Sequence, residues 1–170
     1  MFPDYCHVSL RSYGCYDEWE AYGYIEVDEE RFLFSKLGSS STNLRGINTM
    51  ILDTENCSAN EWKQFDTHGR TAAADRLVEY LRSLADGTIV LGVTFDDPTH
   101  FLKPAALSAL RNFGVAPNNL KYRGKFTFFI RIGWTENVLA FDEKDPRDGV
   151  SRIDHQFPGV WHDLILSIVL

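Results

Sequence analysis

A chain of 170 residues, of which 44 % are hydrophobic, is long and apolar enough to form one domain with a sizeable core. Its net charge of −7 argues against nonspecific binding to nucleic acid, which needs a basic surface, and against binding to anionic lipid. No apolar run approaches the roughly 20 residues of a membrane helix, so we expect no membrane insertion.

The N-terminal part of the chain has the pattern of antiparallel strands. Short stretches of apolar and aromatic residues are separated by polar turns, among them the Gly/Ser-rich stretch 38–43. We predict strands over residues 8–11, 22–27, 31–37, 47–53 and 61–65. The tyrosine and tryptophan residues between positions 13 and 24 favour cross-strand packing, with a sugar-stacking platform as the alternative.

The hydrophobic period changes in the second half of the chain. Apolar residues recur at helical spacing from Ala74 to Leu84 and predict a helix that ends before Gly87. A second helix is predicted from Pro104 to the residue before Gly114. Around these helices we predict a buried strand over 88–94, an acidic loop over 95–98, a strand over 125–132, a charged loop over 142–152 and a final strand over 164–170. This order predicts an α+β domain in which helices pack on a largely antiparallel sheet.

Six short motifs between residues 45 and 133, taken in their order and spacing, make the chain resemble the ILEI/PANDER domain. That domain is the fold of the interleukin-like epithelial–mesenchymal-transition inducers. The motifs are Arg45-Gly46-Ile47-Asn48, Phe65-Asp66-Thr67-His68-Gly69, Asp86-Gly87-Thr88-Ile89-Val90-Leu91, Thr94-Phe95-Asp96-Asp97, Phe113-Gly114 and Tyr122-Arg123.

The resemblance implies a sandwich of two twisted, largely antiparallel β-sheets flanked by two or three helices. It implies that residues 5–170 form a single ILEI/PANDER-like domain of an extracellular or secretory-pathway protein, with no cofactor and no established catalysis. The same domain is similar to the stem module of protein O-linked-mannose N-acetylglucosaminyltransferase. In that branch the implied partner is a glycan or glycoprotein. The alternative is a secreted, cytokine-like protein that binds a cell-surface receptor.

The residues that match the sugar-contacting positions of the stem-module branch are Arg45, Asp97 and Arg123. A carboxylate accepts hydrogen bonds from vicinal hydroxyls, and an arginine donates a rigid fork to ring or acetamido oxygens. Tyr122 is placed to cover an apolar sugar face. Competing interpretations are a loop-capping role for Asp97, which precedes a proline, and a structural ion pair between Asp97 and Arg123.

Asp66, His68 and Asp97 also allow a metallohydrolase interpretation, because divalent metals take histidine and carboxylate ligands. The constellation is incomplete, since Asp66 or Thr67 fits the N-cap of the following helix equally well. We therefore expect no metal site and no enzyme.

The chain contains three cysteines, Cys6, Cys15 and Cys57. Cys6 and Cys15 flank a short predicted strand and turn, so a disulfide between them is one prediction, with unpaired thiols as the alternative. Secreted members of the family carry paired cysteines, one near the C-terminus, whereas no cysteine follows Cys57 here. Asn56 lies in an N-glycosylation tripeptide, Asn56-Cys57-Ser58, which matters if the chain is secreted. The printed N-terminus contains no signal peptide, so secretion is an expectation from the resemblance.

Overall fold

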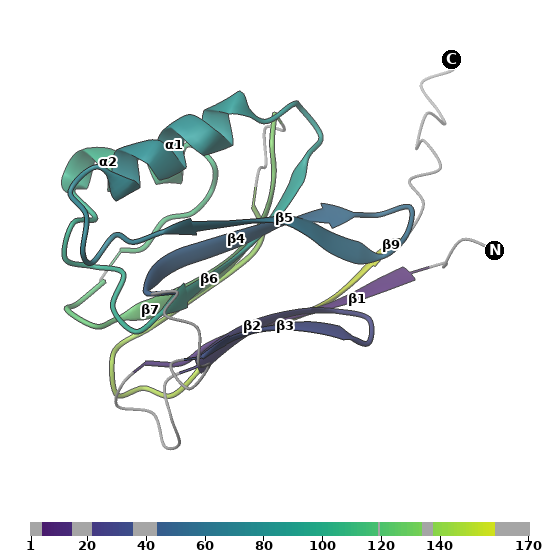
Figure 1. The fold of residues 1–170 in the computed structure, drawn as a ribbon, viewed down its shortest axis with the longest axis horizontal. Coiled ribbons are helices and arrows are strands. Elements are labelled where there is room, and N and C mark those ends of the chain that lie inside the picture. Colours follow the sequence, from purple (N-terminus) through teal and green to yellow (C-terminus); the bar gives the residue numbers. More distant parts are fainter. Residues whose placement is uncertain (1–4, 15–21, 36–43, 119, 134–137, 159–170) are drawn as a thin grey trace, which may run out of the picture.

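The structure is a computed structural model that describes residues 5–14, 22–35, 44–118, 120–133 and 138–158. These residues contain nine strands and two helices. The strands form two stacked antiparallel sheets, and both helices lie on the outer face of the larger sheet (Figure 1). The predicted α+β sandwich of two antiparallel sheets is therefore confirmed, with two helices in the described part of the chain.

The smaller sheet has four strands in the order β3-β2-β1-β9. These strands are β1 (Tyr5–Ser12), β2 (Tyr22–Val27), β3 (Glu30–Ser35) and β9 (Ser151–Pro158). Along β1 the side chains of Cys6, Val8 and Leu10 are buried, while Tyr5 and His7 are exposed. Because successive residues of a strand point to opposite faces, one face of this sheet packs inward and the other meets solvent.

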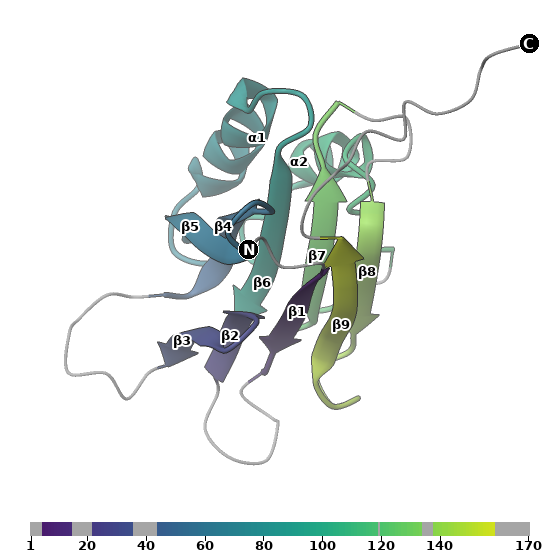
Figure 2. The same ribbon diagram turned by 90° about the vertical axis from the view of Figure 1, so that its right-hand side faces the viewer.

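The larger sheet has five strands in the order β5-β4-β6-β7-β8. These strands are β4 (Gly46–Asp53), β5 (Ser58–Phe65), β6 (Ile89–Phe95), β7 (Lys125–Arg131) and β8 (Val138–Lys144). Every residue of β6 is buried, since the helices cover one face of the sheet and β1 and β2 cover the other. Figure 2 shows β1 lying across β6 and β7, and β9 lying across β7 and β8.

The two helices are α1 (Ala73–Ser83) and α2 (Pro104–Arg111). In α1 the predicted apolar stripe faces the sheet, because Ala74, Leu77, Val78 and Leu81 are buried. Pro104 occupies the first turn of α2, where its missing N–H has no intrahelical partner to lose. Both helices thus begin and end within about three residues of the predicted positions.

The core has two layers, one on each face of the larger sheet. Leu91, Val93 and Phe129 face the smaller sheet, whereas Val90 and Phe128 face the helices. Gly92, opposite Phe128 in the β6–β7 ladder, has no side chain because the ring fills its place: a Cβ atom there would lie 2.1 Å from Cζ of Phe128. The ring of Phe128 can therefore lie over β6 only with glycine at this position.

One predicted element needs correction near the C-terminus of the described chain. Residues 142–152 were predicted as a charged loop, but β8 extends to Lys144 and β9 begins at Ser151, leaving only a short turn between them. Ile153 and Phe157 are buried, while Arg152, Asp154 and Gln156 are exposed. Arg152, the last residue of the predicted loop, therefore lies on the outward face of an edge strand. The final strand predicted over 164–170 lies outside the described residues.

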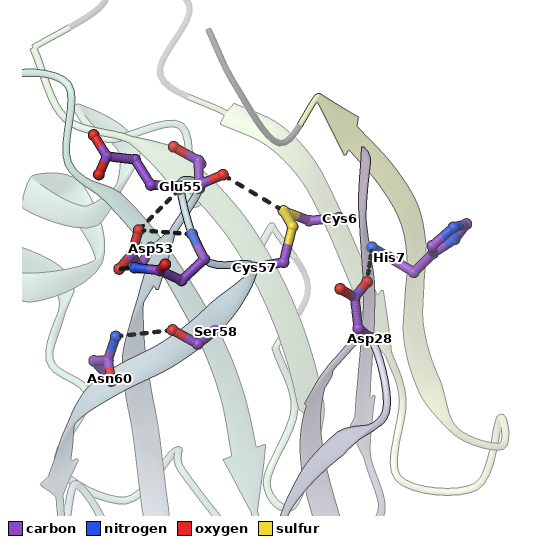
Figure 3. The surroundings of a disulfide bond; sticks show 10 residues. Cys6, His7, Asp28, Asp53, Glu55, Cys57, Ser58 and Asn60 are labelled. Carbon is purple, nitrogen blue, oxygen red and sulfur yellow. Dashed lines mark hydrogen bonds between the residues drawn. A yellow bond between two sulfur atoms is a disulfide. The ribbon is translucent and has the colours of Figure 1, made fainter. Parts of the chain in front are cut away.

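A disulfide joins the two sheets, and it differs from the predicted pair. The bond links Cys6 in β1 to Cys57, which immediately precedes β5, with the two Cα atoms 5.2 Å apart (Figure 3). The predicted Cys6–Cys15 bond is wrong, because the sulfur of Cys6 is already bonded. β1 also continues as an extended strand for six residues beyond Cys6, which carries the chain about 20 Å away. Cys15 itself lies outside the described residues.

Candidate functional site

Four strand ends meet at one end of the larger sheet. β4 begins at Gly46, opposite Phe95 at the end of β6 and next to Phe65 at the end of β5. β7 runs antiparallel to β6 and begins at the same end, at Lys125. We call the residues at this end the strand-end cluster: Arg45, Asp66–Gly69, Asp97–Phe101 and Tyr122–Gly124. Three loops and the residue before β4, far apart in the sequence, thus form one surface, as the resemblance implied for Arg45, Asp97 and Arg123.

The carboxylate of Asp97 is the buried centre of the strand-end cluster, with Asp97 only 1 % exposed. Its Oδ1 accepts hydrogen bonds from the backbone N–H (2.8 Å) and the hydroxyl (2.6 Å) of Thr99, and a longer one from the backbone N–H of Arg123 (3.4 Å). Its Oδ2 lies 3.0 Å from Nδ1 of His68. Asp97 therefore ties three loops together, and the loop-capping interpretation of this residue describes its contacts in the structure.

The bond to Asp97 determines the tautomer of His68. Burial by itself raises the pKa of Asp97, but hydrogen bonds from Thr99 and from His68 outweigh it and hold the pKa below the ordinary value of 3.8. An ionised carboxylate can only accept hydrogen bonds, so Nδ1 of His68 carries the proton. The Nε2 atom of a neutral His68 is then an acceptor, on a side chain that is 29 % exposed.

Arg45 is held by a carboxylate that follows β5. Its Nε and Nη2 atoms lie 3.2 and 3.3 Å from the two oxygens of Asp66, and Oδ1 of Asp66 also accepts the backbone N–H of Gly69. Gly69 leaves room for this pair, because a Cβ atom there would lie 2.4 Å from Asp66 and 2.6 Å from Arg45. The guanidinium is thus held by two parallel hydrogen bonds to one carboxylate.

Tyr122 and Arg123 form the outer part of the strand-end cluster. The Cζ atom of Arg123 lies 5.2 Å from the centre of the Tyr122 ring, within range of a cation–π contact. The backbone of Arg123 is left-handed, with φ of 63°, which is uncommon outside glycine. Tyr122 is 59 % exposed and is one of the few large hydrophobic side chains at the surface of the described chain.

Sequence reasoning missed the roles of three polar residues of the strand-end cluster. The sequence pattern around Asp66 and His68 suggests metal ligands or a helix cap, yet Asp66 orients Arg45 and His68 binds Asp97. No sequence motif points to His100, whose ring centre lies 5.4 Å from that of His68 and 4.5 Å from that of Phe101. The motif Phe65-Asp66-Thr67-His68-Gly69 marks Asp66 and His68 as residues of interest in the sequence. Their hydrogen-bond partners, Arg45 and Asp97, are seen only in the fold.

Within the described residues, no group of three or more histidine, cysteine or acidic side chains is placed to hold a metal ion. Asp66 pairs with Arg45 whereas His68 pairs with Asp97, so the residues of the metal interpretation have separate partners.

Acid should weaken the fold through the two buried carboxylates. Burial raises the pKa of Asp66 as well, but the hydrogen bond from Arg45, the N–H of Gly69 and nearby positive charge lower it below 3.8. A carboxyl with a lower pKa in the folded state stabilises the fold above its unfolded pKa, and this contribution is lost as the pH falls below about 4. We expect urea titrations from pH 7 to pH 3 to give a shallower pH dependence of the free energy of unfolding for Asp97→Asn than for the wild type. An unchanged pH dependence would show that Asp97 does not carry it.

The fold and the strand-end cluster define a disulfide-bonded β-sandwich with a surface formed by loops. A model of the interleukin-like EMT inducer family matches residues 45–134, and the chain belongs to this family. The matched segment contains every residue of the strand-end cluster. No curated protein matches the chain. Neither helix of the described chain is long and apolar enough to cross a membrane. The family and the disulfide together indicate an extracellular-type module.

Proposed function

We propose that this chain is a non-catalytic module that binds carbohydrate through the strand-end cluster. The observation that carries the proposal is the buried Asp97 carboxylate, which holds His68, Thr99 and the backbone of Arg123 in a fixed arrangement. Such preorganisation reduces the entropy lost when a flexible, hydrated ligand is bound.

Four side chains of the strand-end cluster that are exposed or partly exposed have the chemistry that a sugar needs. Arg45 and Arg123 donate to ring or acetamido oxygens, and Nε2 of His68 accepts from a hydroxyl. The ring of Tyr122 covers an apolar sugar face. Asp97, which the resemblance assigns to sugar contact, is buried, and its role in this proposal is to hold His68 and the backbone of Arg123 in place.

A glycan array probed with the purified chain tests the proposal, with Tyr122→Ala as the diagnostic variant. We expect selective binding that Tyr122→Ala weakens about tenfold, equivalent to about 1.4 kcal/mol, because the stacking surface is lost. The matched control is Tyr5→Ala, which removes another tyrosine of similar exposure, 53 %, from the smaller sheet. Equal loss in both variants, or an array without binding by folded protein, would contradict the proposal.

The second candidate is a cytokine-like ligand for a cell-surface receptor. Trp62 favours it, because this side chain is 43 % exposed on β5, an edge strand, and its Nε1 atom lies 3.3 Å from Oδ1 of Asn48. Fixed, exposed tryptophans are typical of protein interfaces. Saturable binding to cells that survives glycosidase treatment and is lost in Trp62→Ala would support this candidate.

A further inference from the structure

The sequence has one N-x-[ST] tripeptide, Asn56-Cys57-Ser58, and its central residue is half of the disulfide. The tripeptide lies where the β4–β5 hairpin turns, and Asn56 is exposed. β4 runs from Gly46, which follows Arg45 of the strand-end cluster, to Asp53, which precedes this turn, so the two sites lie at opposite ends of the larger sheet. A glycan on Asn56 would therefore leave the strand-end cluster open.

In the folded, oxidised chain the tripeptide is held in three ways. Cys57 is buried, bonded to β1 and left-handed, with φ of 47° (Figure 3). Ser58 is paired with Asp53 at the start of the β4–β5 ladder. The amide Nδ2 of Asn56 donates to Oδ2 of Asp53 at 2.8 Å. An enzyme that must enclose the asparagine and the serine together cannot lift this segment from the surface.

We propose that Asn56 is an N-glycan acceptor, and that glycosylation of Asn56 competes with closure of the Cys6–Cys57 disulfide. Glycosylation succeeds only while Cys57 is still a thiol and β5 has not yet paired. The inference requires that the chain enters an oxidising secretory compartment, and it does not depend on what the strand-end cluster binds.

Two chemical steps compete for the same segment. In the first, Nδ2 of Asn56 forms a bond to the anomeric carbon of an oligosaccharide carried on a lipid pyrophosphate. The carbon–oxygen bond to the pyrophosphate breaks, the lipid pyrophosphate leaves, and the amide loses one proton. In the second, the thiols of Cys6 and Cys57 lose two protons and two electrons to the disulfide of a thiol oxidoreductase, which becomes a dithiol.

Glycosylation of Asn56 has a limited time in which to occur before the disulfide closes. At about 5–20 residues per second, synthesis of residues 58–170 alone takes on the order of ten seconds. The Cys6–Cys57 bond joins residues 51 positions apart in two different sheets, and such non-local β pairing forms slowly. Disulfides form over roughly seconds to hours. Glycosylation of Asn56 therefore precedes disulfide closure in some chains and not in others.

Pulse-labelling of the full chain, directed into the endoplasmic reticulum of cultured cells, tests the proposal. The readout is the fraction of chain whose mobility shift is removed by peptide-N-glycosidase. We expect partial occupancy in the wild type, and occupancy about twofold or more higher in Cys6→Ser and in wild type pulsed with dithiothreitol. Dithiothreitol should not raise occupancy further in Cys6→Ser. Because glycosylation is read on newly made chains, the result does not depend on whether Cys6→Ser folds.

Ser58→Ala is the matched control, because it removes the acceptor hydroxyl and keeps both cysteines; it should show no shift. Absence of a shift in Cys6→Ser and in reduced wild type would show that Asn56 is not an acceptor. Equal occupancy in wild type and Cys6→Ser would show that the disulfide does not compete.

Discussion

Replacing Cys6 by alanine is expected to lower the free energy of unfolding by about 4 kcal/mol, since the Cys6–Cys57 bond closes a loop of about 50 residues in the unfolded chain. The bond also joins β1 of the smaller sheet to the start of β5 in the larger sheet, so its loss frees the two layers at this end. Urea unfolding of the oxidised wild type and of Cys6→Ala measures the difference.

A double-mutant comparison separates the bond from the side chains. Cys6→Ala, Cys57→Ala and the double variant should have nearly the same stability, because each removes the same bond. Cys15→Ala should not share this loss, since it leaves the Cys6–Cys57 bond in place. Additive losses in the double variant, or a loss of about 4 kcal/mol in Cys15→Ala, would contradict the pairing.

Asp97→Ala is the second substitution for which we expect a large effect, a loss of about 3–5 kcal/mol in the free energy of unfolding. The variant leaves three partly buried donors without their acceptor, namely the N–H and hydroxyl of Thr99 and the Nδ1–H of His68. The loops of the strand-end cluster would then lose their common anchor. Chemical unfolding measures the loss, and amide exchange at Thr99 and Arg123 locates it.

Two variants calibrate the Asp97 result. Asp97→Asn keeps the size and one acceptor oxygen, so a smaller loss of about 1–2 kcal/mol is expected. Asp154→Ala removes a more exposed carboxylate that accepts two hydrogen bonds from Arg11, and such surface pairs contribute about 1 kcal/mol or less. Equal stability of Asp97→Ala and Asp154→Ala would mean that Asp97 is not the anchor.

The helices and central strands were predictable because their signals are local. The apolar stripe of α1 and the continuous apolar run of β6 each depend on neighbours in the sequence. β9 was not predicted because its outward face carries three polar side chains, Arg152, Asp154 and Gln156. They made the segment look like a loop, although Ile153 and Phe157 are buried. The pairing of β9 with β1 is a contact between the two ends of the described chain, which no local pattern contains.

The site was predictable only in part, for a related reason. The positions of Arg45, Asp97 and Arg123 came from a resemblance, and the fold places all three at one end of the larger sheet. The partners that hold them could not be predicted, because Asp66 and His68 meet Arg45 and Asp97 only after β5 and β6 lie on either side of β4. The disulfide was predicted wrongly for the same reason. The spacing of cysteines in the sequence does not indicate which strands become neighbours in the fold.

The separation between the buried Asp97 and the exposed residues around it has an evolutionary consequence. Tyr122 and His100 contribute little to the core, whereas Asp97 and Thr99 fix the loops that present them. Substitutions at the exposed positions can therefore accumulate at small cost in stability, and each changes the chemistry offered at the surface. A gene duplicate of this chain could acquire a new ligand by a few point mutations in these loops, while its strands, disulfide and folding route stay as they are.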